Sequence, residues 1–178
     1  RFPFDKFATA SNELGTQMKA TGEVMGIGAN LEEALLKGIR SLESGENHIY
    51  HPKFNDMTVD EMLEYISKFR SDNIFAIAQL MRMGVSVEKL HDVTKITAYF
   101  LEAVKKIIDM ENLLKEKAGD SETLLAAKKM GFSDEFIARL WNMSELEVFA
   151  IRKENRMFPA YKMVDTFHTG AYIPYFYS

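Results

Sequence analysis

Met83-Gly84-Val85-Ser86-Val87-Glu88-Lys89-Leu90 decides the fold, because the sequence contains a second copy of this stretch. Forty-seven positions later the chain reads Met130-Gly131-Phe132-Ser133-Asp134-Glu135-Phe136-Ile137. In each copy the glycine can take the left-handed conformation that ends one helix, and the serine two residues later can cap the next helix. We therefore predict an internal repeat of two small helical units, over about residues 74–104 and 121–151.

A longer helix is predicted between the two units, from about Thr97 to Lys117. Its apolar residues recur at alternating steps of four and three, the spacing of a coiled-coil seam: Ile96, Phe100, Ala103, Ile107, Met110 and Leu114. Leu101, Val104 and Ile108 widen this face to about half of the helix, which is too broad for one partner helix. We expect this helix to run through the centre of a bundle or to join one to another chain.

Capping patterns predict the remaining helices. Asn30, with Glu33 three residues later, begins a helix that ends near residue 42. Thr58 to Glu61 is a capping box, and the helix that follows is predicted to bury Met62, Ile66 and Phe69. Asp72 is predicted to cap the next helix. Further helices are expected over residues 73–83, 122–130, 134–140 and 145–156.

The two ends of the chain differ from its middle. Residues 1–29 alternate small and apolar residues among glycines, which predicts short strands and turns, and the polar stretch 44–56 is typical of a linker or long loop. Beyond Pro159 the chain is aromatic and extended. The predicted fold is therefore mainly all-α: two repeated αα units around a long central helix, a short β-containing N-terminal segment and an extended aromatic C-terminal tail. A domain boundary is placed near Glu43, between residues 1–43 and 44–178.

Composition narrows the class of protein. The 178 residues are 47% hydrophobic and 27% charged, which is ordinary for a soluble globular protein. A net charge of −4 gives no general attraction to nucleic acid or to an anionic membrane, so neither is expected as a partner. The absence of cysteine excludes disulfides, thiolate metal sites and a cysteine nucleophile in this sequence. No apolar run approaches the roughly 20 residues that span a bilayer, so we expect a soluble protein.

The second copy of the repeat has the spacing of a DNA-binding helix-turn-helix. Asn142 can make the turn and Ser144 can cap a recognition helix. That helix, however, begins with Glu145 and Glu147, which repel phosphate, and its basic residues come only at the far end. Structural helix packing is the alternative that we favour, and a salt-dependent gel shift distinguishes the two.

Other candidate motifs also have structural explanations. His48 and His51 have metal-ligand spacing but no evident third ligand, so we expect them to be surface residues of the polar loop. Gly26-Ile27-Gly28 precedes a helix, but its spacing matches no phosphate-binding pattern and indicates a tight turn. The acidic residues are expected on solvated helix surfaces. The residues by themselves therefore predict no catalytic constellation, no cofactor-binding residue and no metal site.

Several stretches taken together resemble a known family. Residues 1–7 and 17–28, the latter with Thr-Gly-Glu-Val-Met, resemble the end of the first ATP-grasp unit in the large chain of carbamoyl-phosphate synthase. The helical repeat, Tyr161-Lys162-Met163-Val164-Asp165-Thr166 and the final Tyr175-Phe176-Tyr177-Ser178 resemble the segment that follows it there. The resemblance covers nearly the whole chain in the right order, but residues 167–174 are shorter than in the family and lack its glutamate-aromatic pair.

The resemblance implies a function. That large chain makes carbamoyl phosphate from bicarbonate, glutamine-derived ammonia and two ATP, for arginine and pyrimidine biosynthesis. Residues 1–43 would be the end of its carboxyphosphate ATP-grasp unit, and residues 44–178 its all-α oligomerisation and connection domain. The expected partners are the rest of the large chain, the small glutaminase subunit and a second copy of this domain.

The resemblance also predicts what lies elsewhere in the parent enzyme. The chain begins at Arg1 without methionine and ends after an aromatic run, so we expect a non-catalytic fragment of that enzyme. Mg-ATP, with magnesium or manganese, would bind the parent chain and no cofactor would bind this fragment. Glu23 matches a glutamate that lines the family's interior passage for carbamate. A glutamate at this position is equally explained by packing or by a surface ion pair.

Overall fold

The computed structural model describes residues 13–18, 23–42, 45–165, 170 and 176–177. This part of the chain is mainly helical, with eight α-helices, one 3-10 helix and one pair of very short strands. The elements in chain order are α1 (Leu31–Ser41), η1 (Pro52–Phe54), α2 (Val59–Ile66), α3 (Asn73–Arg82), α4 (Val87–Thr94), α5 (Ala98–Glu116), α6 (Ser121–Lys129), α7 (Asp134–Trp141), α8 (Glu145–Glu154), β1 (Lys162–Met163) and β2 (Phe176–Tyr177).

The helix boundaries around the two related stretches lie where their residues predict. Gly84 and Gly131 have φ angles of 89° and 92°, the left-handed conformation that ends α3 and α6. The side chains of Ser86 and Ser133 each accept a hydrogen bond from the backbone N–H three residues later, at the start of α4 and α7. These local predictions are confirmed, while the arrangement of the chain as two repeated units stays a prediction.

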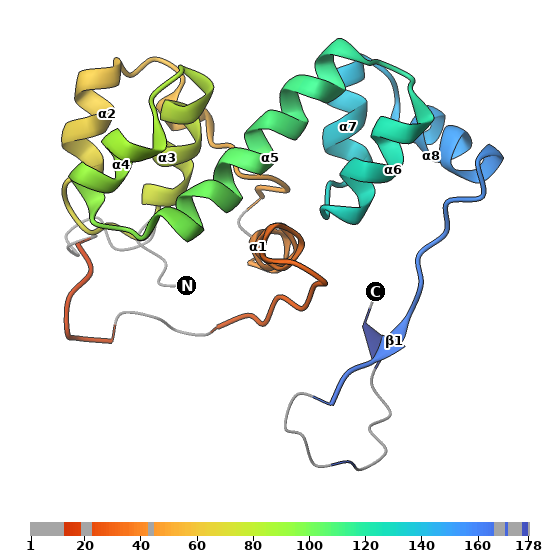
Figure 1. Ribbon diagram of the computed structural model, residues 1–178, viewed down its shortest axis with the longest axis horizontal. Helices are drawn as coiled ribbons and strands as arrows, with labels where there is room; N and C mark the ends of the chain where they lie inside the picture. The colour runs from red at the N-terminus through yellow and green to blue at the C-terminus, as the bar shows by residue number, and fades with distance from the viewer. Residues whose placement is uncertain (1–12, 19–22, 43–44, 166–169, 171–175, 178) are drawn as a thin grey trace.

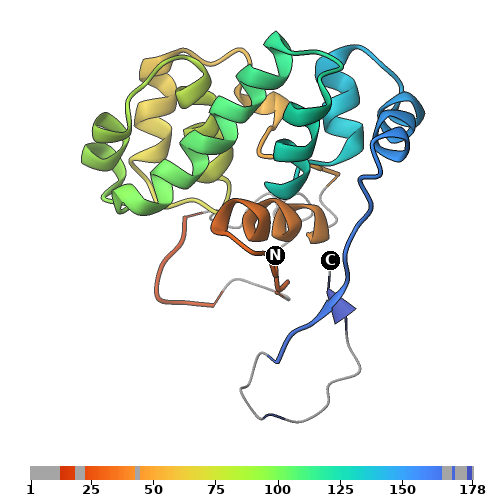
Figure 2. The ribbon, with the colours of Figure 1, turned by 45° about the vertical axis from the view of Figure 1, so that its right-hand side comes forward.

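The long helix α5 runs between two groups of helices, with α2, α3 and α4 at one end and α6, α7 and α8 at the other (Figure 1). It contacts α3 and α4 in the first group, α6 and α7 in the second, and α1, which lies beneath it (Figure 2). Its predicted broad apolar face is buried at most positions: Leu101, Ala103, Val104, Ile107, Ile108 and Leu114. These contacts support the first of the two expectations for α5, a central position among helices, while an interface with another chain stays a prediction.

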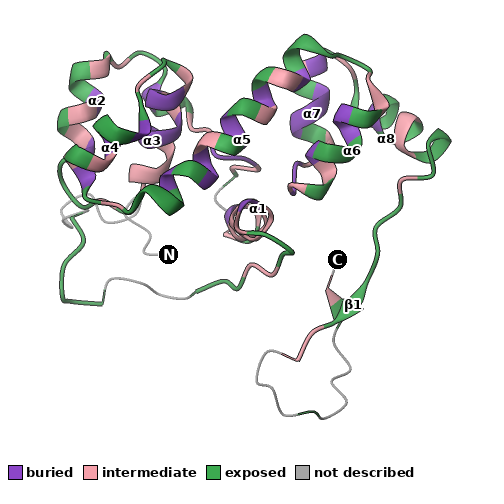
Figure 3. Cartoon of the chain, viewed as in Figure 1, coloured by how far each residue is buried: buried purple, intermediate pink, exposed green. Residues whose placement is uncertain are grey.

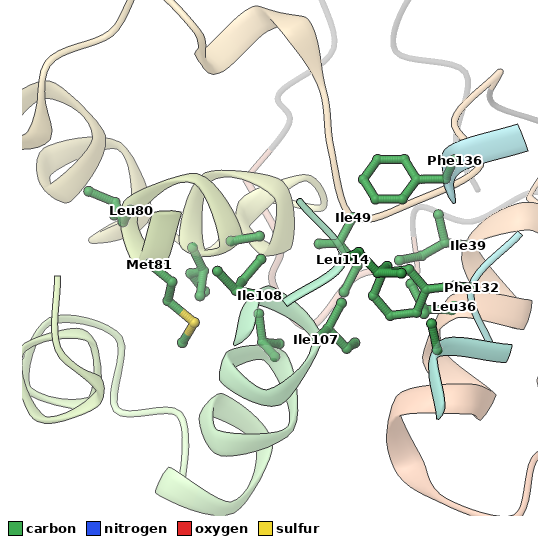
Figure 4. Packing of buried hydrophobic residues seen from close by; sticks show 14 of the residues in the cluster. Leu36, Ile39, Ile49, Leu80, Met81, Ile107, Ile108, Leu114, Phe132 and Phe136 are labelled. Atoms are coloured by element: carbon green, nitrogen blue, oxygen red, sulfur yellow. The ribbon is translucent and has the colours of Figure 1, made fainter. Parts of the chain in front are cut away.

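One hydrophobic core joins these elements, and its buried residues line the inner sides of the helices (Figure 3). Around α5 it includes Leu36 and Ile39 from α1 and Phe132 from the turn before α7 (Figure 4). The polar stretch 44–56 also contributes, because Ile49 and Phe54 are 0% and 1% exposed. This segment is therefore packed into the core along part of its length, which its polar composition did not predict.

The roles predicted for three residues are wrong, two of them as buried residues and one as a helix cap. Phe69 is 65% exposed, because α2 ends at Ile66 and the helical spacing does not continue to residue 69. Phe100 is 53% exposed in the first turn of α5, where its ring packs edge-on against Tyr99, which is 71% exposed. Asp72 makes no side-chain cap for α3, because its carboxylate instead accepts hydrogen bonds from Lys53 and from the Tyr65 hydroxyl.

The segments at the two ends are only partly described. Before α1, residues 13–18 and 23–30 contain one isolated β-bridge, which joins Glu13 to Arg70, and no strand, so the strands predicted there are not formed; those predicted in residues 1–12 and 19–22 lie outside the described part. After α8, β1 and β2 pair antiparallel, with Lys162 opposite Tyr177 and Met163 opposite Phe176. Most of the divergent stretch 167–174 also lies outside the described residues. No helix in the described part of the chain is long and apolar enough to cross a membrane.

Candidate functional site

A buried ionic cluster lies where the segment before α2 meets α3 and α5. Arg82, from the end of α3, donates to Glu111 of α5 through Nε (2.9 Å to Oε2) and through Nη2 (2.7 Å to Oε1). His48 lies 2.8 Å from the same Oε1 through its Nε2, and Arg82 Nη2 also donates to the carbonyl of Ile49 at 2.7 Å. His48 and Glu111 are only 1% and 2% exposed. We refer to His48, Arg82 and Glu111 as the buried cluster.

The cluster has a defined charge. Burial favours the protonated form of Glu111, but the hydrogen bonds from Arg82 and His48 outweigh it and hold the pKa of this carboxyl below its usual range. Burial lowers the pKa of His48, and the hydrogen bond to Glu111 only partly offsets it. At neutral pH the cluster therefore contains an ionised Arg82–Glu111 pair and a neutral imidazole that donates its Nε2 proton to the carboxylate.

This position of His48 corrects the expectation of a surface histidine. Its ring stacks on Phe136 of α7, with centroids 3.6 Å apart, and lies 4.8 Å from the ring of Phe132. His51 remains partly exposed and faces the rings of Phe54 and Phe75. In the described part of the chain, no group of three histidine, cysteine or acidic residues is arranged to hold a metal ion.

The burial of Glu111 was also not predicted, because the acidic residues were expected on solvated helix surfaces. A signal was nevertheless present in the sequence. Residue 111 lies seven positions after Val104 and three before Leu114, so a carboxylate interrupts the apolar face of the predicted long helix. A charge at such a position needs a buried partner, and the sequence alone does not indicate that this partner is Arg82.

A second polar contact fastens α1 to the turn between α6 and α7. Arg40 Nη1 donates to the carbonyl of Gly131 at 2.6 Å, and burial lowers the pKa of this guanidinium. A Cβ atom added to Gly131 would lie 3.0 Å from the Cα of Glu33. The turn and α1 therefore approach each other closely, and glycine permits that approach.

The helix-turn-helix geometry is present locally, but its chemistry does not suit DNA. Asn142 has φ of 53° at the turn and Ser144 caps α8 in a full capping box. The first turn of α8 presents Glu145 and Glu147 to solvent. Arg152 is paired with Asp134 of α7, so its charge is already compensated.

The segment before α1 contains the predicted passage residue and the two glycines for which a tight turn was predicted. Glu23 is exposed in the structure. Added Cβ atoms at Gly26 and Gly28 would lie 2.2 Å from the Ala34 carbonyl oxygen and 2.7 Å from the Ala34 nitrogen. The backbone of residues 26–28 therefore packs directly against α1 although no turn is formed there, and Lys37 Nζ donates to the carbonyl of Ile27 at 3.2 Å.

The fold and its polar contacts define a mainly helical domain whose buried charges join helices to one another. A family model described as carbamoyl-phosphate synthetase large chain, oligomerisation domain, matches residues 23–156. This match covers most of the sequence, so the chain belongs to that family. The resemblance drawn from the sequence is confirmed over these residues, and the family's domain comes from an ATP-dependent ligase.

Proposed function

We propose that this chain is part of the large chain of a glutamine-hydrolysing, cytoplasmic carbamoyl-phosphate synthase, in which it is a non-catalytic oligomerisation and connection scaffold between two ATP-grasp halves. The observation that carries the proposal is the family match over residues 23–156. Residues 1–43 end the carboxyphosphate unit and residues 44–178 form the helical domain with its two repeated units. Mg-ATP binds elsewhere in the parent chain, which also recruits the small glutaminase subunit.

The packing of α1 supports a connecting role. This helix belongs to the preceding unit by the proposed boundary at residue 43, yet Leu36 and Ile39 are buried in the core around α5. The Arg40 contact with the Gly131 carbonyl adds a second attachment. A helix shared in this way transmits the orientation of the preceding unit to the helical domain.

Glu23 is proposed to line the carbamate passage of the parent enzyme. Its exposure is compatible with that role, because a carboxylate beside a polar passage has to remain in contact with water or substrate. The backbone that follows at residues 26–28 is packed tightly against α1, which supports the neighbouring residues.

The purified chain is expected to hydrolyse no ATP, with or without bicarbonate and Mg²⁺. The reason is that the resemblance places the ligands of Mg-ATP upstream of this segment. Coupled-enzyme measurement of ADP release tests this, with the complete large chain as the positive control. Sustained turnover by the purified chain, at a rate that survives repeated purification, would contradict the scaffold proposal.

Self-association is expected to depend on exposed apolar side chains. Two groups stand out: Tyr99 and Phe100 on α5, and Leu146 and Phe149 on α8, each between 47% and 79% exposed. Sedimentation equilibrium is expected to show concentration-dependent association that weakens at least tenfold when Glu replaces either Tyr99 or Phe149, because a charge in an apolar interface costs more than about 1.4 kcal/mol.

Glu102→Gln provides the matched control, because it changes charge on the exposed surface of α5 without adding a carboxylate to either apolar group. A monomer at all concentrations would contradict self-association by this chain. Association that is unaffected by both glutamate substitutions would place the interface elsewhere.

A further inference from the structure

The segment that connects α1 to α2 is held at one point where four elements meet. Ile49 is buried in the same hydrophobic core as Leu114 of α5 and Phe136 of α7 (Figure 4). Its carbonyl accepts a hydrogen bond from Arg82 of α3. The preceding residue, His48, reaches Glu111 of α5 and stacks on Phe136. The buried cluster is therefore the place where this segment is attached to both groups of helices.

His48 is suited to this place only as a neutral ring. Its Nε2 is satisfied by Glu111, but its Nδ1 is buried and has no hydrogen-bond partner among the described residues. Protonation would turn Nδ1 into an N–H donor without an acceptor, in a site walled by the rings of Phe132 and Phe136. Leaving such a donor unsatisfied is unfavourable.

The charged groups around His48 do not compensate a positive charge on its ring in addition to that of Arg82. Arg82 faces it from α3, Glu111 from α5 and the more distant Arg40 from α1, while α7 contributes the uncharged Phe136. The Glu111 carboxylate already accepts two hydrogen bonds from Arg82, so its negative charge is matched by that guanidinium. A protonated His48 would leave this buried site with a net positive charge.

We propose that the buried cluster is an acid-released latch, in which neutral His48 holds residues 45–56 across the junction of α3, α5 and α7, and protonation of His48 releases this segment. Opening exposes the imidazole to water, where it titrates near its ordinary value. The proton therefore binds more tightly to the open form than to the closed form.

The direction of the pH effect follows from this difference. Burial lowers the pKa of His48 in the closed form, so the open form binds more protons in the window between that lowered value and about 6.5. As the pH falls through this window, the opening equilibrium is expected to rise by up to tenfold per pH unit, the slope for one proton. Above about pH 6.5 the latch stays closed.

Hydrogen–deuterium exchange of peptides from residues 45–56 tests the proposal, after correction for the intrinsic pH dependence of exchange. The wild-type chain is expected to lose protection of this segment below pH 6.5, while the fluorescence of Trp141, the only tryptophan, remains native. His48→Phe keeps an aromatic ring against Phe136 and removes the titrating group, so its protection should not depend on pH in this range. His51→Asn is the matched control, because it removes the neighbouring partly exposed histidine, and it should behave as the wild type.

Titration of the histidine ring signals by NMR provides a measurement on the unmutated chain, in case His48→Phe does not fold. Titration of His48 is expected below about pH 6.5, the ordinary value of an imidazole, together with the loss of protection in residues 45–56. The proposal is overturned if His48 titrates at or above about 6.5, if its titration leaves the segment protected, or if Trp141 fluorescence changes at the same pH as the segment opens.

The latch is a property of this chain and does not depend on the proposed scaffold function. The effect of the latch on a parent synthase, in contrast, rests on the proposed function. In such an enzyme residues 45–56 would connect an ATP-grasp unit to the helical domain, and opening of the latch would loosen that connection. ATPase and sedimentation measurements on this chain test the scaffold function, whereas exchange and NMR titration test the latch, so failure of one is distinguishable from failure of the other.

Discussion

Replacing Arg82 by methionine is expected to lower the free energy of unfolding by about 3–5 kcal/mol, because it removes the charged partner of a buried carboxylate. Arg82 makes two hydrogen bonds to Glu111, which is 2% exposed, and a third to the carbonyl of Ile49. Methionine preserves much of the aliphatic stem, so the loss reports mainly on the polar contacts. Urea unfolding followed by the fluorescence of Trp141, which is buried against Leu114, measures the difference.

The double variant Arg82→Met with Glu111→Leu separates the net contribution of the pair from the cost of breaking it. Removing both charges leaves no unpaired buried charge, and such replacements of a buried pair are often neutral or stabilising, although here His48 Nε2 and the Ile49 carbonyl also lose their partners. The double variant is therefore expected to be more stable than Arg82→Met alone. The interpretation fails if Arg82→Met lowers the free energy of unfolding by less than about 1 kcal/mol. It also fails if the loss in the double variant equals the sum of the losses in Arg82→Met and Glu111→Leu measured separately.

Replacing Gly131 by alanine is expected to destabilise the protein by about 2–5 kcal/mol, the sum of a backbone penalty and a packing penalty. The φ angle of 92° disfavours any residue with a Cβ atom. The added methyl group would also lie 3.0 Å from the Cα of Glu33 and 3.3 Å from its carbonyl oxygen, so α1 would have to move. Thermal or urea unfolding measures this loss.

Gly84 provides the matched control, because it occupies the corresponding position in the first of the two related stretches. Its φ angle is 89°, but nothing lies within 4 Å of an added Cβ atom. Gly84→Ala should therefore show only the backbone penalty, about 1–2 kcal/mol. Equal losses at the two glycines would contradict the close approach of α1 to the turn before α7.

Most of the helical architecture was predictable because its signals are local. The serines that cap α4 and α7 bond to backbone groups three residues away, and the glycines that end α3 and α6 act through their own φ angles. The apolar face of α5 likewise follows from its 3.5-residue spacing. Such patterns determine where a helix begins, where it ends and which side it buries.

Two of the errors, at Asp72 and His48, occurred because the side chain interacts with residues from other elements of the chain. Asp72 had the position and chemistry of a cap, but Lys53 and Tyr65 hold its carboxylate instead. His48 belongs to a polar stretch and was expected at the surface, although the ring of Phe136 covers it. In both cases a tertiary partner competed successfully with the local interaction.

The sequence by itself therefore determined the family, the helices and the central position of α5, since these depend on local spacing and on motifs in order. Only the tertiary structure decided that His48, Arg82 and Glu111 meet and that α1 packs against the turn at Gly131. His48 and Glu111 are 63 residues apart, and Arg82 and Glu111 are 29 apart. Their buried charges require partners, but the partners are selected by how the helices pack around α5, which no local pattern specifies.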